Sequence, residues 1–154
     1  TPAPINSWIM GMHLESLGVR MERHCANALA VAKWLDADPR VSWVSFPGLE
    51  TDKYHALAEK YMPNGTCGVI SFGVPGGREK VSAFLDHLKM VSIATHVADA
   101  RSCTLYPAGT THRQLTEEQL EEAGVGIDLV RLSCGIENTA DIIADLDQAL
   151  AAVQ

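Results

Sequence analysis

Arg131 is the residue whose position in this sequence most clearly calls for a chemical explanation. It lies within DLVRLSCGIEN (Asp128 to Asn138), a segment whose apolar residues predict a buried strand. Because side chains alternate along a strand, two sets face opposite sides of the sheet: Leu129, Arg131 and Ser133 on one side, and Val130, Leu132 and Cys134 on the other. The sequence therefore predicts a permanent cation in the middle of a sheet.

The guanidinium of Arg131 needs a partner if helices cover its side of the sheet, as we expect. Burying an unpaired charge costs several kcal/mol of folding free energy. One candidate partner is a carboxylate within the protein. The other is the carboxylate of a ligand, which the planar guanidinium binds through two parallel hydrogen bonds. Alternation along the strand does not choose between them.

A second candidate for binding is the segment HVADARSCTLYPAGTTHRQL (His96 to Leu115). Its polar side chains have no obvious packing role: His96, Asp99, Arg101, Ser102, Thr110, Thr111 and His112. Together with Pro107 and Gly109, this composition is typical of a structured binding loop. An exposed loop that contains a strand fits the composition equally well.

Metal, phosphate and thiol sites are not favoured by the spacing of the residues. The six histidines and four cysteines form no CxxC or HxxxH pair, so no metal site is predicted. The glycines of GVPGGREK (Gly73 to Lys80) match neither phosphate-loop pattern, and we expect a turn between a strand and a helix. Cys134 alternates with core residues, and a buried thiol is a poor nucleophile.

Helices and strands alternate along the chain. A helix-compatible stretch from Ile5 to Leu17 precedes a firmer helix from Arg20 to Asp36. We expect further strands at 41–46, 67–74 and 102–106, and further helices at 52–61, after Gly77, from the capping-box sequence TEEQ at Thr116, and from Asn138 or Thr139. A short apolar piece, 90–93, is left unassigned. This order predicts an α/β fold, a sheet covered by helices, with parallel and antiparallel pairing left open.

Composition limits the classes of function. The 154 residues, 47% hydrophobic and 20% charged, suffice for one domain with a sizeable core. A net charge of -7 argues against nucleic acid or an anionic membrane as a partner, because both attract basic surfaces. No apolar run is long enough to span a bilayer. The widely spaced cysteines favour buried, reduced thiols, so we expect a soluble cytoplasmic protein.

Three stretches of the sequence resemble the Cys/Met-metabolism family of PLP-dependent enzymes. They are VRLSCGIENTADIIADLDQAL (Val130 to Leu150), YPAGTTHRQLTEEQLEEAG (Tyr106 to Gly124) and LESLGVRMERH (Leu14 to His24). A fourth, YHALAEKYMPNGTCGVISFGVPGG (Tyr54 to Gly77), is similar to the O-acetylhomoserine sulfhydrylase branch. The resemblance implies the small C-terminal domain of the fold type I, aspartate aminotransferase-like architecture. Residues 1–19 would be a linker helix from a cofactor domain outside this chain, and residues 20–154 the substrate-binding domain.

The resemblance also implies roles for individual residues. Arg131 would bind the α-carboxylate of an amino-acid substrate. His96 would line the same pocket at a position where relatives carry Ser or Asn. Thr111, which belongs to the Thr-His pair of the family, is the third residue expected to bind the substrate. Ala98 stands where a glycine is usual. Arg101 replaces a Glu of the lyase and synthase branches, which favours the sulfhydrylase branch.

The cofactor implied by the resemblance is pyridoxal 5'-phosphate, which the family holds on a lysine located before the point where this chain begins. The lysines here stand in unrelated contexts. We therefore expect no catalytic residue, no bound cofactor and no activity in this chain alone, and its cofactor-binding residues stay unassigned.

The complete protein would be a transferase that performs γ-replacement, converting O-acetylhomoserine plus sulfide or a thiol to homocysteine or methionine. The family is commonly tetrameric. Alternatives within the family are O-succinylhomoserine sulfhydrylase, cystathionine γ-synthase and methionine γ-lyase. The alternative from another class is a stand-alone α/β domain that binds a small molecule or a partner without catalysis.

Overall fold

A five-stranded mixed sheet forms the centre of the protein. The structure, a computed structural model, describes residues 1–154. The strands are β1 (Val44–Ser45), β2 (Val69–Gly73), β3 (Ser92–Ile93), β4 (Cys103–Leu105) and β5 (Leu129–Ser133). Their order across the sheet is β1-β2-β5-β4-β3, and only β3 and β4 run parallel. The longest strands, β2 and β5, therefore lie side by side near the middle.

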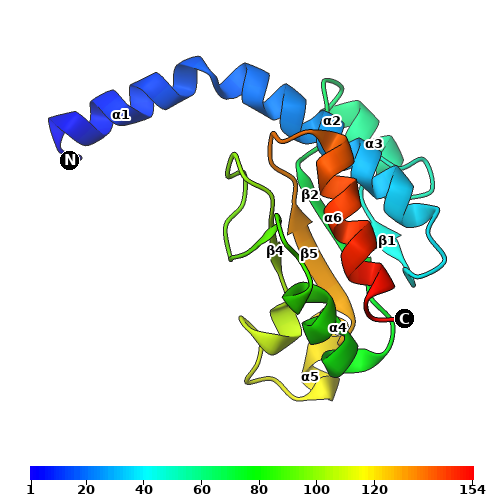
Figure 1. Cartoon of the computed structure of the whole chain (residues 1–154). Helices are drawn as coiled ribbons and strands as arrows, with labels where there is room; N and C mark the ends of the chain where they lie inside the picture. Colours follow the sequence, from blue (N-terminus) through cyan, green and yellow to red (C-terminus); the bar gives the residue numbers. More distant parts are fainter.

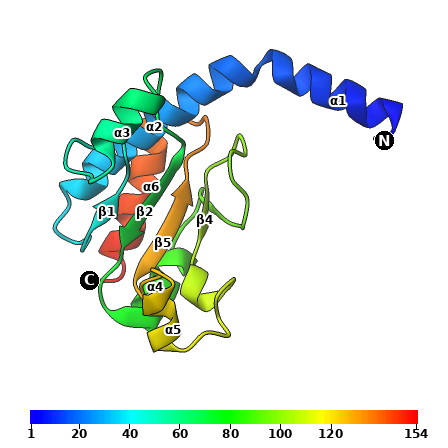
Figure 2. The ribbon, with the colours of Figure 1, turned by 180° about the vertical axis from the view of Figure 1, so that it is seen from behind.

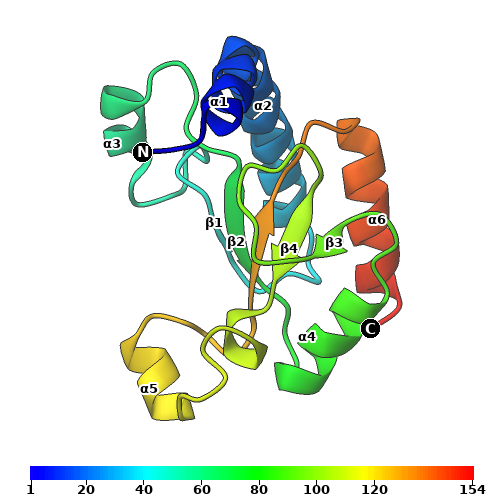
Figure 3. The ribbon, with the colours of Figure 1, turned by 90° about the vertical axis from the view of Figure 1, so that its left-hand side faces the viewer.

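Helices pack mainly on one side of this sheet. They are α1 (Pro4–Glu15), α2 (Leu17–Asp36), α3 (His55–Tyr61), α4 (Gly77–Asp86), the short 3-10 helix η1 (Pro107–Gly109), α5 (Glu117–Glu122) and α6 (Thr139–Ala151). Helices α2, α4 and α6 lie on the same side of the strands (Figure 1, Figure 3). From behind, no helix lies over the middle of β2 and β5 (Figure 2). We call this the helix-free face.

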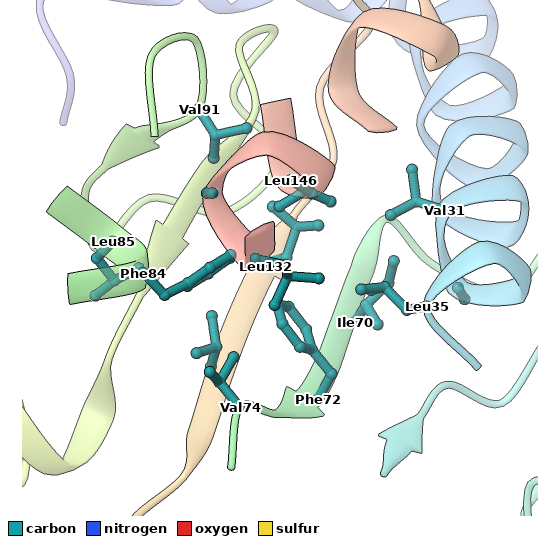
Figure 4. Packing of buried hydrophobic residues seen from close by; sticks show 14 of the residues in the cluster. Val31, Leu35, Ile70, Phe72, Val74, Phe84, Leu85, Val91, Leu132 and Leu146 are labelled. Atoms are coloured by element: carbon teal, nitrogen blue, oxygen red, sulfur yellow. The ribbon is translucent and has the colours of Figure 1, made fainter. Parts of the chain in front are cut away.

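The hydrophobic core lies between the sheet and these three helices. Alternate residues of the central strands are fully buried there: Ile70 and Phe72 from β2, and Val130 and Leu132 from β5. Side chains from α2, α4 and α6 meet them (Figure 4). The rings of Phe72 and Phe84 pack edge to face with their centroids 6.0 Å apart, an arrangement that aromatic quadrupoles favour.

The structure confirms the predicted α/β class and several local signals. Thr116 and Gln119 form the expected capping box at the start of α5, each side chain binding the other residue's backbone amide. Asn138 caps α6 through the amide of Ala140. The Gly73 to Lys80 segment is the predicted turn between a strand and a helix, with Gly76 and Gly77 both at positive φ.

Two predicted limits of a strand and a helix are wrong, and one short strand was not predicted. The strand expected at 41–46 is reduced to β1, although the backbones of Ser42 and Trp43 still hydrogen-bond to Gly73 of β2. The side chains of Ser42 and Trp43 bind the carboxylate of Asp128. The helix expected from residue 52 begins later, because the carboxylate of Asp52 accepts hydrogen bonds from the amides of Phe46 and Tyr54 and holds a turn. The unassigned piece at 90–93 contains β3.

Helix α1 projects from the body of the molecule and buries none of its residues (Figure 1). A break at Ser16 separates it from α2, whose first buried residue is His24. Its apolar side chains face solvent on all sides, with Trp8 60% and Leu14 66% exposed. None of the helices combines the length and the apolar character needed to cross a membrane.

Candidate functional site

Arg131 lies at the centre of β5, paired with Ser71 of β2 on one side and Leu105 of β4 on the other. Its neighbours in sequence, Val130 and Leu132, point into the core and are completely buried. The alternation predicted for this strand is therefore correct. The expectation that helices cover Arg131 is wrong. Arg131 alternates with the buried Val130 and Leu132, so it faces the other side of the sheet, and it is only half-buried. No helix lies over the middle of β5 on that side (Figure 2).

The guanidinium of Arg131 binds backbone carbonyls rather than a carboxylate. Its Nη2 nitrogen donates to the carbonyl oxygens of Thr95 at 3.1 Å and His96 at 3.3 Å. No acidic side chain forms an ion pair with it, so the first of the two candidate partners, an internal carboxylate, is not found in this chain. Nη1 makes no hydrogen bond, and Nε is buried without a partner. Arg131 therefore keeps its positive charge, and some of its N–H groups have no hydrogen-bond partner.

The carbonyls that hold Arg131 belong to the β3–β4 loop (residues 94–102), which crosses the helix-free face. The hydroxyl oxygen of Ser133 accepts a hydrogen bond from the amide of Ala98 at 3.1 Å. The thiol of Cys103 donates to the carbonyl of His96 at 3.1 Å. Ala98 has a φ of 59°, in the left-handed region that favours glycine. The loop is thus attached to β4 and β5 beside Arg131.

A polar network fixes the far end of the same loop. The carboxylate of Glu137 accepts from the amide of Ser102 at 2.6 Å and from its hydroxyl at 2.9 Å. The Ser102 oxygen in turn accepts from the amide of Gly135 at 2.8 Å. The side-chain amide of Asn27 donates to the carbonyls of Gly135 and Glu137, both at 2.9 Å. The loop, the end of β5 and α2 are therefore joined.

Sequence reasoning missed the residues of this network. Asn27 is 0% exposed although it lies on a helix whose buried side is otherwise mostly apolar. A polar residue at a core position of an amphipathic helix was the signal that could have drawn attention to it, because buried amides need partners. Glu137 offered no such signal, since its partner Ser102 lies 35 positions away in the chain.

The other predicted site residues differ in how close they come to Arg131. His96 is adjacent through its backbone carbonyl, and its side chain is exposed. Thr111 is also exposed, and its hydroxyl pairs with Nδ1 of His112 at 2.9 Å. It forms no hydrogen bond with Arg131 or His96. The chain thus brings Arg131 and His96 together and leaves Thr111 in the segment between η1 and α5.

The family of the chain follows from its match to a family model. The model described as Cys/Met metabolism PLP-dependent enzyme matches residues 1–151, nearly the whole chain. The chain belongs to this family. The resemblance noted in the sequence, and the fold class expected from it, are therefore confirmed.

The relatives that this chain matches in the Cys/Met-metabolism family are much longer than the chain. It is 45% identical to the O-acetyl-L-homoserine sulfhydrylase of Leptospira meyeri and 47% identical to the homocysteine synthase of Schizosaccharomyces pombe. Each match covers 96% of this chain and 34% of the relative. The chain therefore spans about a third of the length of these relatives.

A crystal structure from the same family has the same fold. It is described as an O-acetylhomoserine (thiol)-lyase from Campylobacter jejuni and contains N'-pyridoxyl-lysine-5'-monophosphate. The match has a TM-score of 0.91 at 39% sequence identity and covers 98% of this chain and 36% of that one. Both the family and this neighbour are PLP-dependent, as the resemblance implied.

The five lysines of this chain take no part in the hydrogen bonds around Arg131. Lys53 and Lys60 lie over the rings of their neighbours Tyr54 and Tyr61. Lys33 is on the exposed side of α2, Lys80 follows the turn into α4, and the amide of Lys89 binds Asp145 of α6. None is hydrogen-bonded or paired beside Arg131. The cation at this site is the guanidinium of Arg131.

The cysteines give no nucleophile at this site. Cys134 is completely buried, and burial raises the pKa of its thiol to about 12, so the interpretation of Cys134 as a core residue is confirmed. Cys103 is also buried, whereas Cys25 and Cys67 are only half-buried, and no disulfide forms. The prediction of four buried cysteines is therefore only half correct.

A cleft elsewhere in the chain lies away from Arg131. It has a volume of about 550 Å³ between α2, α3 and the segment 62–66, and its polar lining includes Glu22, His55 and Glu59. Neither Arg131, His96 nor Thr111 lines it. Arg131 lies instead on an open surface.

Proposed function

We propose that this chain is the substrate-carboxylate-binding domain of a PLP-dependent γ-replacement enzyme. The complete enzyme would convert O-acetylhomoserine plus sulfide or a thiol to homocysteine or methionine, with release of acetate. The observation that carries the proposal is Arg131, a half-buried guanidinium without an internal carboxylate, in a chain of a PLP-dependent amino-acid family. The names of the relatives from Leptospira and Schizosaccharomyces support the choice of reaction.

Arg131 would bind the α-carboxylate of the substrate through the N–H groups that the β3–β4 loop leaves free. His96 would line the same pocket, because its backbone already touches the guanidinium. Thr111 would approach the substrate only if other parts of the enzyme bring the segment after η1 into the pocket. Fixing one end of the substrate lowers the entropic cost of reaching the transition state.

The rest of the active site would come from polypeptide outside this chain. We propose that residues 1–19 are a linker helix to a cofactor domain that supplies the lysine, and that residues 20–154 are the substrate-binding domain. The exposed apolar side chains of α1, including Trp8 and Leu14, would be covered in the complete protein. A cytoplasmic homotetramer would be the functional form.

The role of Arg131 is tested by substitution in the full-length enzyme. Arg131→Ala should raise the KM for O-acetylhomoserine about a hundredfold, because hydrogen bonds to a charged partner contribute about 1.5–3 kcal/mol. The KM for sulfide should not change. Arg131→Lys should give an intermediate KM, since an ammonium group cannot form the planar pair of hydrogen bonds.

Arg40 provides the control, because its guanidinium is bound by the carboxylates of Asp38 and Asp147 and makes no hydrogen bond with the β3–β4 loop. Arg40→Ala removes a guanidinium without touching Arg131 or the β3–β4 loop. If both substitutions changed the KM equally, or Arg131→Ala left it unchanged, Arg131 would not bind the carboxylate.

The reaction itself is tested with purified full-length protein. Homocysteine should form from O-acetylhomoserine and sulfide faster than from O-succinylhomoserine, and the native protein should be yellow from bound cofactor. A colourless native protein with the mass of this chain alone would contradict the proposed enzyme and favour a stand-alone binding domain.

A further inference from the structure

Ser133 is a completely enclosed hydroxyl on the helix-free face, two residues after Arg131 on β5. Its exposed fraction is 1%, although no helix covers this side of the strand. The β3–β4 loop provides the cover, because the amide of Ala98 donates to the Ser133 oxygen at 3.1 Å. A buried hydroxyl that holds a loop beside a binding residue needs an explanation beyond packing.

The loop held by Ser133 is the same loop that orients Arg131. The Nη2 nitrogen of Arg131 donates one hydrogen bond to the carbonyl of Thr95 and one to the carbonyl of His96. These two residues precede Ala98 in the loop by three and two positions. Cys103, which pairs with Ser133 across the sheet, donates its thiol to the His96 carbonyl. The loop therefore has two attachment points on neighbouring strands, and the guanidinium lies against the segment they hold.

The strained backbone of Ala98 would make the loop change conformation when the hydrogen bond to Ser133 is lost. Its φ of 59° is a left-handed conformation that an L residue other than glycine adopts at an energetic cost. The hydrogen bond from its amide to Ser133 offsets that cost. Without the hydroxyl, the peptide can relax toward ordinary φ values, which would redirect the carbonyls of Thr95 and His96.

We propose that Ser133 is a positioning residue for the substrate carboxylate. By holding the amide of Ala98, it fixes the two carbonyls that set the direction of the Arg131 guanidinium. The proposal rests on the proposed role of Arg131 and adds to it. Ser133 itself does not touch the substrate, so its effect must be specific for ligands that carry a carboxylate.

The experiment compares two ligands that differ only in that group. L-methionine and 3-(methylthio)propylamine share a side chain and an ammonium group, and only methionine has the carboxylate. Their affinities for the full-length holoenzyme are measured as competitive inhibition constants and by titration of the cofactor absorbance. The ratio of the two affinities reports the carboxylate contact and is insensitive to a general loss of active protein.

In Ser133→Ala this ratio should fall about tenfold, the effect expected for the loss of one well-placed hydrogen bond. Ser133→Thr keeps a hydroxyl and should restore most of the ratio. If Ser133→Ala does not fold, Ser133→Cys carries the test, since it keeps the shape of the side chain and replaces the hydroxyl by a slightly larger, weaker acceptor. A ratio equal to that of the wild type in the folded Ala or Cys variant would overturn the proposal.

Thr104→Val is the matched control for loss of a buried hydroxyl. Thr104 is 2% exposed and binds the carbonyl of Arg131 at 3.1 Å, but it pairs with Leu132 and points away from the loop. In Thr104→Val, the ratio of the affinities for the two ligands should equal that of the wild type. Arg131→Ala distinguishes failure of the proposed function from failure of the role given to Ser133. If the affinity ratio does not change in Arg131→Ala, the proposed function is contradicted. If the ratio falls in Arg131→Ala but not in Ser133→Ala, only the role of Ser133 is contradicted.

Discussion

The carboxylate of Asp145 on α6 lies 2.8 Å from the backbone nitrogen of Val91, immediately before β3. The amides of Lys89 and Met90 donate to the same carboxylate at 2.9 Å. Asp145 is only 6% exposed. One buried anion thus satisfies three consecutive amides and attaches the start of β3 to α6.

Asp145→Asn should lower the free energy of unfolding at pH 7 by about 2 kcal/mol. The amide of Lys89 donates to Oδ1 and those of Met90 and Val91 donate to Oδ2, whereas an asparagine side chain has one accepting oxygen and no charge. Burial raises the pKa of Asp145, but the three amides and Gln148 outweigh it, and the pKa lies below its usual value. A lowered pKa means that this stabilisation is complete above the unfolded-state pKa of about 3.9 and is lost as pH falls through the folded-state value.

Urea denaturation at a series of pH values measures the effect of Asp145. The difference in unfolding free energy between wild type and Asp145→Asn should be constant near neutrality and shrink below about pH 4. Asp141→Asn, an exposed position on the same helix, serves as the control and should change little. A difference that did not depend on pH would exclude the ionised carboxylate as its source.

Gly135→Ala should disrupt the attachment of the β3–β4 loop. A methyl group there would lie 2.5 Å from the backbone nitrogen of Ser102 and collide with the Ala100 carbonyl and the Glu137 carboxylate. Overpacking against backbone should cost about 1–3 kcal/mol of unfolding free energy, measured by urea denaturation. Gly11→Ala on α1, which meets no atom within 4 Å, should instead stabilise its helix by about 0.5–1 kcal/mol.

Ala98→Gly should stabilise the protein slightly, which is unusual for a change to glycine. Relief of the left-handed conformation gains about 1–2 kcal/mol, and the extra freedom of glycine in the unfolded chain costs about 0.5–1 kcal/mol. Ala37→Gly, at an ordinary φ of -87°, should destabilise. Equal destabilisation by both changes in thermal unfolding would contradict the strain assigned to Ala98.

The thiols should react in an order set by burial. At pH 8, N-ethylmaleimide should label Cys25 and Cys67 first, and Cys103 and Cys134 only when the chain unfolds. With a pKa of about 12, Cys134 is ionised in about one molecule in ten thousand at that pH. Peptide mapping by mass spectrometry identifies the labelled sites, and early labelling of Cys134 would contradict its burial.

Much of the strand that carries Arg131 could be predicted from sequence, because alternation is a local property. Which side of the sheet the helices cover could not, since that depends on how α2, α4 and α6 pack together. The strand β3 has two residues, too few for any periodicity. The roles of His96 and Thr111 came from family resemblance, and those roles remain predictions.

Contacts between residues far apart in the sequence are the other reason why parts of the structure could not be predicted. The helix at 52–61 starts late because Asp52 binds the amide of Phe46 from outside the helix. The contact between Glu137 and Ser102 joins two segments that no pattern relates. Both depend on tertiary placement, which overrides local propensity.

The backbone pairing of β5 with β2 and β4 decides which of its side chains enter the core and on which face the guanidinium of Arg131 lies. A shift of that pairing by a single residue would exchange the places of Arg131 and Leu132, putting the cation among α2, α4 and α6. The cost of burying that charge therefore excludes the shifted pairing. The side chain proposed to bind the substrate also ensures that its own strand joins the sheet in the correct register.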